Sequence, residues 1–339
     1  MAAPGNVVAG EDVTPARVQS PRRGFRIINL VAPFLGLLLV IGLFSLSPTV
    51  RPYFLTGENF KIIFTQTVIV AIGSLGMTLI IISGGIDLSV GSVVALTSVV
   101  GASALLKGRT PLEAGVLMTL MGAAIGLLNG VVIGLLRMVP FIVTLGMMGI
   151  ARGMAKWLAN SQTVNPADSS INNLMLLTDP GHFFPLPPGV WITLALAGVM
   201  ALIMRQTVFG RYAFAIGANE AAARLSGVPV GLQKMLIYTF AGLFFGISGM
   251  MQLSRLTQGD PTVAIGLELD IIAAVVIGGA SLNGGSGSIL GSLIGALMMA
   301  VLRNGSNQMG WPTYMQEIII GFVIVLAVAV DKLRQRRTA

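Results

Sequence analysis

Few residues in this chain could do chemistry. The sequence has no cysteine and a single histidine, His182, which excludes thiol chemistry, disulfides and sites built from several histidines. No G-x-x-x-x-G-K-[ST] phosphate-binding loop is present. No paired carboxylates share a face of a predicted helix. We therefore expect no catalytic residue, no metal and no cofactor on this chain.

Asp87 is a charged residue in the otherwise uncharged segment S-G-G-I-D-L-S-V-G-S at 83–92. A carboxylate at membrane depth is costly and is usually functional. A structural role fits the pattern equally well. Asp87 or Ser89 could cap a following helix, while Gly84 and Gly85 could end the preceding one. The sequence leaves both interpretations open.

A short helix is predicted within the segment A-I-G-A-N-E-A-A-A-R-L-S-G-V at 215–228. Asn219 is a good N-cap, Glu220 complements the helix dipole, and Gly227 provides the stop. A helix of about two turns is not stable alone in water, so it must pack against something. It is either a plain connector or a helix that docks on a partner. The candidate residues are Gly217, Asn219, Glu220, Ala221, Ala222, Ala223, Arg224, Leu225, Ser226 and Gly227.

The elements that must position these residues are membrane helices. Of the 339 residues, 54% are hydrophobic and only 10% are charged, whereas a soluble domain has about 25% charged residues. Runs of about 20 apolar residues, enough to cross a bilayer, recur along the chain. The net charge of +8 is scattered between these runs, so we expect contact with the lipid bilayer and no nucleic-acid partner.

The fold class that follows is an all-α polytopic membrane protein with about ten transmembrane helices in two pseudo-symmetric repeats. The eighth and ninth spans are short, and they either cross the membrane or form broken helices. The spans are expected near 27–47, 62–82, 89–106, 112–136, 139–159, 189–204, 234–254, 268–280, 288–302 and 317–331.

The distribution of basic residues predicts the orientation. Lysine and arginine gather near both chain ends and in the loop 205–233, whereas the long loop 160–188 has none. Because basic residues are in excess in cytoplasmic segments, both termini are expected in the cytoplasm. The chain then divides into a disordered tail at 1–26, a transmembrane domain at 27–332 and a basic tail at 333–339.

Two glycine-rich stretches, at 82–96 and 277–293, look alike. Each has a Gly-Gly break after a β-branched run, then a polar turn, then a Gly-Ser pair that opens an apolar helix. The second stretch contains Gly278, Gly279 and Asn283. We infer structural repeats at about 62–160 and 234–331, which is typical of transporters. The alternative is that Gly-Ser pairs are simply common in packed membrane helices.

Three segments together resemble the ribose-type (pentose/hexose) sugar ABC importer permeases. They are the Asp87 segment, the segment at 215–228, and V-V-I-G-G-A-S-L-N-G-G-S-G-S-I-L-G-S-L-I-G-A-L at 275–297. They occur in the family's order and at its spacing. The likeness covers about residues 60–332, and residues 1–26 show none.

The resemblance implies a transport subunit of a bacterial inner (plasma) membrane. Expected partners are a cytoplasmic ABC ATPase, often a fused tandem subunit that binds ATP and Mg, a periplasmic sugar-binding protein, and a second permease copy or paralogue. Residues 219–227 fall where the family has its coupling helix, in the loop 205–233. The match to the general Glu-Ala-Ala loop of importers is loose, because the glycine comes only at Gly227.

A pathway for a neutral sugar would need hydrogen-bonding side chains without fixed charge. Candidates are Gln66, Asn129, Thr144 and Gln252, and Phe141 could stack on a sugar face. Bonding between helices would explain each of them equally well. Charged residues near the external face are expected to dock a binding protein or to form salt bridges: Arg255, Asp260, Glu268, Asp270 and Arg303.

Two other functions stay open. A permease of a branched-chain amino-acid importer would need charged partners in its pathway, and the sequence offers few. A stand-alone secondary transporter would work without an ATPase.

Overall fold

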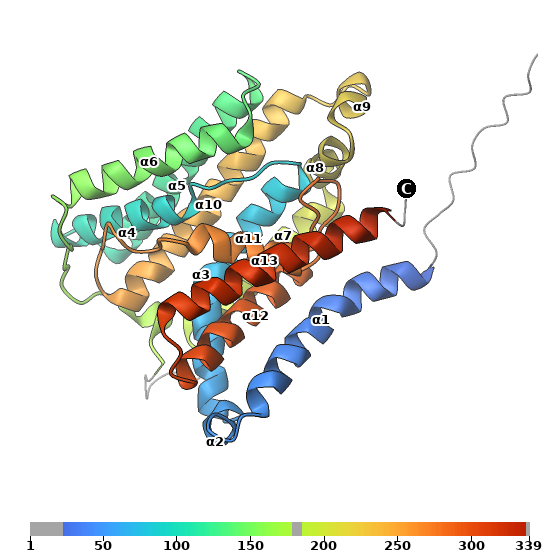
Figure 1. The fold of residues 1–339 in the computed structure, drawn as a ribbon. Coiled ribbons are helices and arrows are strands. Elements are labelled where there is room, and N and C mark those ends of the chain that lie inside the picture. Colours follow the sequence, from blue (N-terminus) through green and yellow to red (C-terminus); the bar gives the residue numbers. More distant parts are fainter. Residues whose placement is uncertain (1–22, 178–184, 337–339) are drawn as a thin grey trace, which may run out of the picture.

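The computed structural model describes residues 23–177 and 185–336, which form a bundle of α-helices (Figure 1). The helices are α1 (Arg23–Ser45), α2 (Arg51–Phe54), α3 (Gly57–Ile82), α4 (Val90–Leu106), α5 (Pro111–Gly134), α6 (Pro140–Leu158), α7 (Pro188–Gln206), α8 (Val208–Ala218), α9 (Glu220–Leu225), α10 (Val230–Leu256), α11 (Leu267–Ile277), α12 (Ile289–Gln308) and α13 (Thr313–Arg336). A 3-10 turn, η1 (Asn172–Met175), lies between α6 and α7. Extended pairing in these ranges is limited to one bridge, between Val164 and Gly259.

Six described helices are long and apolar enough to cross a membrane: α3, α5, α6, α7, α10 and α12. Shorter apolar stretches occur at Pro33–Ser45, Val90–Leu106 and Thr313–Leu326, within α1, α4 and α13. The predicted all-α polytopic membrane fold is confirmed.

The eighth and ninth predicted spans, at 268–280 and 288–302, correspond to helices of different length. α11 has 11 residues, which at 1.5 Å per residue reach about 16 Å, half of a bilayer core. α12 has 20 residues and runs past the predicted end at 302. In its polar last turns, the Gln308 amide donates to Asn59 Oδ1 at 2.7 Å and to Asn304 Oδ1 at 3.3 Å.

The outer boundaries of the chain also differ from the prediction. α1 begins at Arg23, earlier than the expected start at 27. α13 runs through most of the predicted basic tail to Arg336, since the sequence D-K-L-R-Q-R contains no helix breaker. The rest of the predicted tails, and His182, lie outside the described residues.

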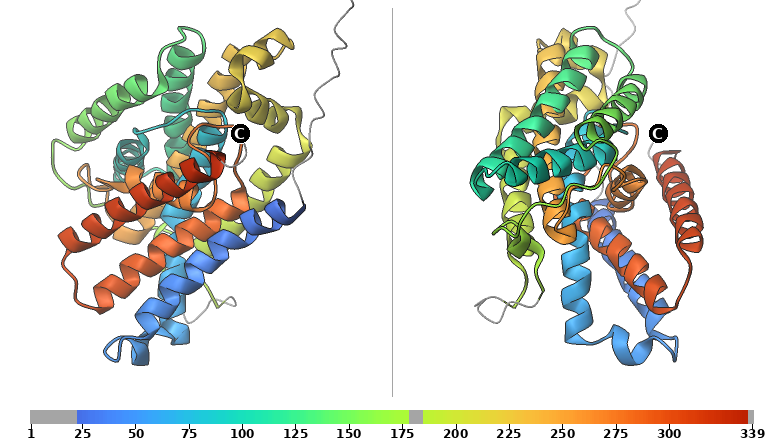
Figure 2. Two further views of the ribbon diagram at one scale, coloured as in Figure 1. Left: turned by 45° about the vertical axis from the view of Figure 1, so that its right-hand side comes forward. Right: turned by 90° about the vertical axis from the view of Figure 1, so that its left-hand side faces the viewer.

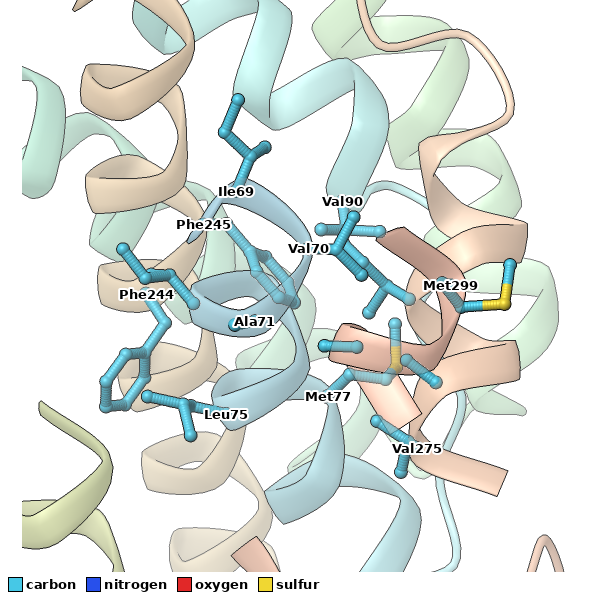
Figure 3. Close-up of a cluster of buried hydrophobic side chains, with 14 of the residues drawn as sticks. Ile69, Val70, Ala71, Leu75, Met77, Val90, Phe244, Phe245, Val275 and Met299 are labelled. Carbon is cyan, nitrogen blue, oxygen red and sulfur yellow. The ribbon is translucent and has the colours of Figure 1, made fainter. Parts of the chain in front are cut away.

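The core is built around α3 and α10. In the most apolar 18-residue stretch of α3, 89% of the residues are buried, against 17% in α6. α3 is therefore central, and α6 faces outward. Figure 3 shows the α3 side chains meeting those of α4, α10, α11 and α12 in one apolar cluster. The labelled members are Ile69, Val70, Ala71, Leu75, Met77, Val90, Phe244, Phe245, Val275 and Met299. α1 and α13 lie at the edge of the bundle (Figure 2).

α5 and α10 approach each other through glycines. On α5, an added Cβ at Gly130 would stand 2.7 Å from the Met235 Cα, and one at Gly122 or Gly126 would meet α10 backbone as well. Small residues at every fourth position let two backbones touch in this way. The sequence shows this spacing on α5 as Gly122, Gly126, Gly130 and Gly134.

Candidate functional site

The short helix predicted in the loop 205–233 is present as α9, at the end of the bundle opposite α2 (Figure 1). The Asn219 side chain accepts a hydrogen bond from the Ala222 N–H at 2.9 Å, which is the predicted N-cap. Gly227 has φ +83°, a left-handed conformation that favours glycine and ends the helix. α9 spans six residues, less than two full turns.

Packing and charge hold α9 in place. Ala223 is buried against Ile216 of α8 and Val230 of α10. Glu220 forms ion pairs with Arg224 at 3.0 Å and with Lys234 of α10 at 2.7 Å. Burial raises the pKa of Glu220, but the bonds and charges of Lys234 and Arg224 outweigh it, so the pKa lies below its usual value. Glu220 is therefore charged at neutral pH, and both ion pairs persist.

The outward face of α9 is apolar. Ala221, Ala222 and Leu225 are exposed, and their spacing of three and four residues places them on one side of a helix. The Leu225 side chain is 90% exposed. Nothing in the described part of the chain covers this face. α9 is not one of the described helices that are long and apolar enough to cross a membrane, and it lies at one end of the bundle.

The base of α9 touches both glycine-rich stretches. Gly217, at the end of α8, lies so close to the Ile82 carbonyl and the Gly285 amide that an added Cβ would collide with both. The Gly285 N–H donates to the Ile82 carbonyl at 2.8 Å. Gly284 packs against the backbone of Gly84 and Gly217. Three separate chain segments thus meet at one backbone junction directly before α9.

The two glycine-rich stretches end their helices in the same way. After α3, the Gly84 N–H bonds to Ile81 O at 2.9 Å and the Gly85 N–H to Ile80 O at 3.0 Å. After α11, Gly279 bonds to Val276 O at 2.9 Å and Ala280 to Val275 O at 3.1 Å. Gly84 and Gly279 have φ +80° and +93°. Gly84 therefore corresponds to Gly279, and the Gly278 position is taken by Ser83. Asn283 lies in the turn that follows, with its carbonyl near Gly84.

Asp87 lies in a buried polar cluster just before α4, where it bonds to Ser89, the N-cap residue, whose own side chain makes no capping hydrogen bond. Its Oδ1 accepts from the Ser89 N–H at 2.7 Å and from the Ser89 hydroxyl at 2.6 Å. Its Oδ2 accepts from the Asn129 amide at 3.3 Å. The neighbouring Ile86 carbonyl accepts from the hydroxyls of Tyr238 and Thr144, each at 3.4 Å. Asn129 and Thr144 are fully buried there.

Two cavities with polar side chains in their walls lie toward the end of the bundle away from α9. The larger, of about 760 Å³, lies between the first half of α3, turn η1 and the end of α10. The smaller, of about 350 Å³, lies between α3, α10, α11, α12 and the start of α13. Gln66 and Arg255 line both, and Gln252 lines the smaller. Asn129 and Thr144 line neither, and Phe141 is half exposed on α6.

Comparison with known proteins decides the family. The family described as "Branched-chain amino acid transport system / permease component" matches residues 59–328. This chain belongs to that permease family. No solved structure matches it.

The permease has sugar-import relatives. It is 40% identical over 300 residues to the ribose import permease protein RbsC of Escherichia coli K12, covering 88% of this chain and 94% of the relative. To RbsC of Bacillus subtilis it is 37% identical over 307 residues, 90% and 94% of the two chains. To the L-arabinose ABC transporter permease protein AraH of Azospirillum brasilense it is 35% identical over 294 residues, 86% and 85%. The resemblance to ribose-type permeases is confirmed.

The sequence anticipated only part of this permease's polar architecture. Asp270 and Arg303, expected to form either salt bridges or a docking surface, form an ion pair of 2.5 Å at the wall of the smaller cavity. Ser169 and Asn172, in the wall of the larger cavity, were not anticipated. Ser254 of α10 ties that loop down, bonding Met175 N–H at 3.0 Å and Asn172 O at 3.1 Å. A polar loop outside the spans carries no periodic signal that would place it beside α3.

Replacing Asp87 by alanine is expected to destabilise the permease. The Ser89 amide and hydroxyl would lose their acceptor in a buried site, at about 1–3 kcal/mol for each unsatisfied group. Asp87→Asn keeps an oxygen acceptor for Ser89 and should cost less. Thermal unfolding in detergent measures the order, wild type above Asp87→Asn above Asp87→Ala. Wild-type stability of Asp87→Ala together with lost transport would contradict a structural role and favour a functional carboxylate.

Proposed function

We propose that this permease is the transmembrane subunit of a binding-protein-dependent ABC importer for a monosaccharide, such as a ribose-like pentose, a hexose or a polyol. Its place is the bacterial inner membrane, with both termini in the cytoplasm. The relatives with ribose and arabinose in their names support the substrate class. The branched-chain amino-acid alternative is less favoured, since these relatives import sugars.

The observation that carries the mechanism is α9. A surface helix normally hides its apolar residues, yet α9 exposes Ala221, Ala222 and Leu225 outside the apolar helices. An apolar helix face of this kind fits a groove on a protein partner. We propose that this partner is a cytoplasmic ATPase, which binds ATP and Mg, and that α9 is the coupling helix.

The packing around α9 supports transmission of force into the membrane helices. The ion pairs of Glu220 fasten α9 to α10 through Lys234. The junction at Gly217 brings it against the end of α3 and the turn before α12. In this proposal a displacement of α9 moves α3, α10 and α12 together, and access to the pathway alternates between the two sides of the membrane.

The remaining partners follow from the importer class. A periplasmic sugar-binding protein delivers the sugar at the end of the bundle opposite α9, and a second copy or a paralogue of this chain completes the pathway. The ATPase is a fused tandem subunit. The chain itself contributes no ATPase site and no catalytic residue.

Reconstitution tests the proposal. The proteoliposomes hold this permease with the tandem ATPase and binding protein from its own operon. They should take up D-ribose or L-arabinose only when ATP is present on the side of the membrane where the ATPase is bound. Permease alone should take up neither. Uptake by the permease alone under a proton or sodium gradient would overturn the proposal, and ATP-driven uptake of leucine but of no sugar would assign it to the amino-acid class.

A further inference from the structure

We propose that the 350 Å³ cavity between α3, α10, α11, α12 and α13 is a binding chamber for a single neutral, hydroxyl-rich molecule of monosaccharide size. This inference rests on the proposed function, because it names where the imported sugar sits within this chain. The volume of this cavity lies at the lower end of the range for small-molecule pockets, which is about 300–1,000 Å³.

The lining of the chamber has the chemistry of a polyol site. Gln66 and Gln252 contribute amides, each of which can both donate and accept a hydrogen bond. A sugar hydroxyl also does both, so amides match it without a fixed charge. The Gln66 Oε1 is buried without a hydrogen-bond partner. A buried acceptor without a partner costs free energy that a ligand hydroxyl would recover.

The ion pair in the wall adds geometric selectivity. Asp270 is buried and pairs with Arg303 at 2.5 Å through one carboxylate oxygen and one guanidinium nitrogen. The other carboxylate oxygen of Asp270 can accept from one ligand hydroxyl, and the remaining N–H groups of Arg303 can donate to the adjacent hydroxyl. Hydrogen bonds to charged groups are stronger than those between neutral groups. The pair thus fits two adjacent hydroxyls on one ring.

The charged side chains of the chamber argue against a cationic ligand. The smaller cavity alone has one acidic and two basic side chains, Asp270, Arg255 and Arg303. Arg255 also lines the larger cavity, where Asp168 supplies a second carboxylate. In the smaller cavity Asp270 is already paired with Arg303, so no carboxylate there is free to compensate a ligand ammonium group. A cationic ligand would therefore leave its own charge without compensation.

Thiol labelling tests the chamber, because the chain has no cysteine of its own. Cysteines are introduced singly as Gln66→Cys and Thr313→Cys, which line the chamber, and as Thr49→Cys, which is exposed before α2 outside it. The Thr313 side chain is exposed on the surface of the protein. The Thr313→Cys variant is therefore expected to fold even if Gln66→Cys does not. The reagent is a small, membrane-impermeant methanethiosulfonate applied to the permease alone in oriented membrane vesicles.

We expect all three thiols to react, and D-ribose, L-arabinose, D-glucose or myo-inositol at millimolar concentration to slow labelling at 66 and 313 by about threefold or more, as for a weak complex. Thr49→Cys should be unaffected. Absence of protection by all four sugars, or protection by leucine or gluconate in place of them, overturns the inference. The assay needs no ATPase, so its failure is distinguishable from failure of ATP-driven uptake.

Discussion

Replacing Leu225 by aspartate is expected to abolish ATP-driven sugar uptake by the assembled importer while the permease still folds in the membrane. The Leu225 side chain is 90% exposed in the free chain, so the change costs the permease itself little. In the complex, a carboxylate would be buried in an apolar groove without a partner, at about 2 kcal/mol or more of binding free energy. Co-purification with the ATPase and uptake into proteoliposomes measure the two effects.

The matched control is Leu225→Met, which keeps an apolar side chain of similar size and should retain both docking and uptake. Thermal unfolding of both variants should match the wild type. Full uptake by a Leu225→Asp permease would remove α9 from the coupling role. Loss of folded protein in that variant would mean that Leu225 is packed rather than exposed in the membrane.

Gly217→Ala is the second change with a large expected effect: we expect little folded permease, and no uptake from what remains. The added Cβ would collide with the Ile82 carbonyl and the Gly285 amide, both of them backbone atoms. Overpacking typically costs about 1–3 kcal/mol, and more when backbone has to shift. Membrane yield and thermal unfolding in detergent give the measurement.

Gly198→Ala in α7 is the matched control, since a Cβ there has nothing within 4 Å. Alanine also favours the helix over glycine, so this variant should be as stable as the wild type or more so. If Gly217→Ala were equally stable and active, the close junction between α8, the end of α3 and the turn before α12 would not exist. Stability with loss of uptake would instead assign the junction to coupling alone.

These two changes act on one assembly from opposite sides. Leu225 faces the proposed ATPase, and Gly217 faces the two glycine-rich turns. Between them, Glu220 fastens the helix to Lys234 of α10. The Thr78 hydroxyl donates to Ser292 Oγ at 2.6 Å and ties α3 to α12 just below the junction. A short rigid helix on a backbone contact can move several membrane helices together, whereas a flexible connector could not.

The sequence by itself determined the membrane class, the positions of the long apolar helices and the location and capping of α9. These features depend on local chemistry: apolar length, an asparagine N-cap and a left-handed glycine stop all act within a few residues. The family could be identified for the same reason, because its three segments are contiguous in the chain.

Only the tertiary structure decided what the isolated polar residues do. Asn129 and Gln252 are both polar side chains in apolar helices, yet Asn129 bonds to Asp87 in the core while Gln252 lines a cavity. At the polar end of α12, the Gln308 amide donates to Asn59, far away in the chain. A hydrogen-bond partner from a distant segment cannot be inferred from the local sequence pattern. That partner determines whether a buried polar group supports the fold or faces a ligand.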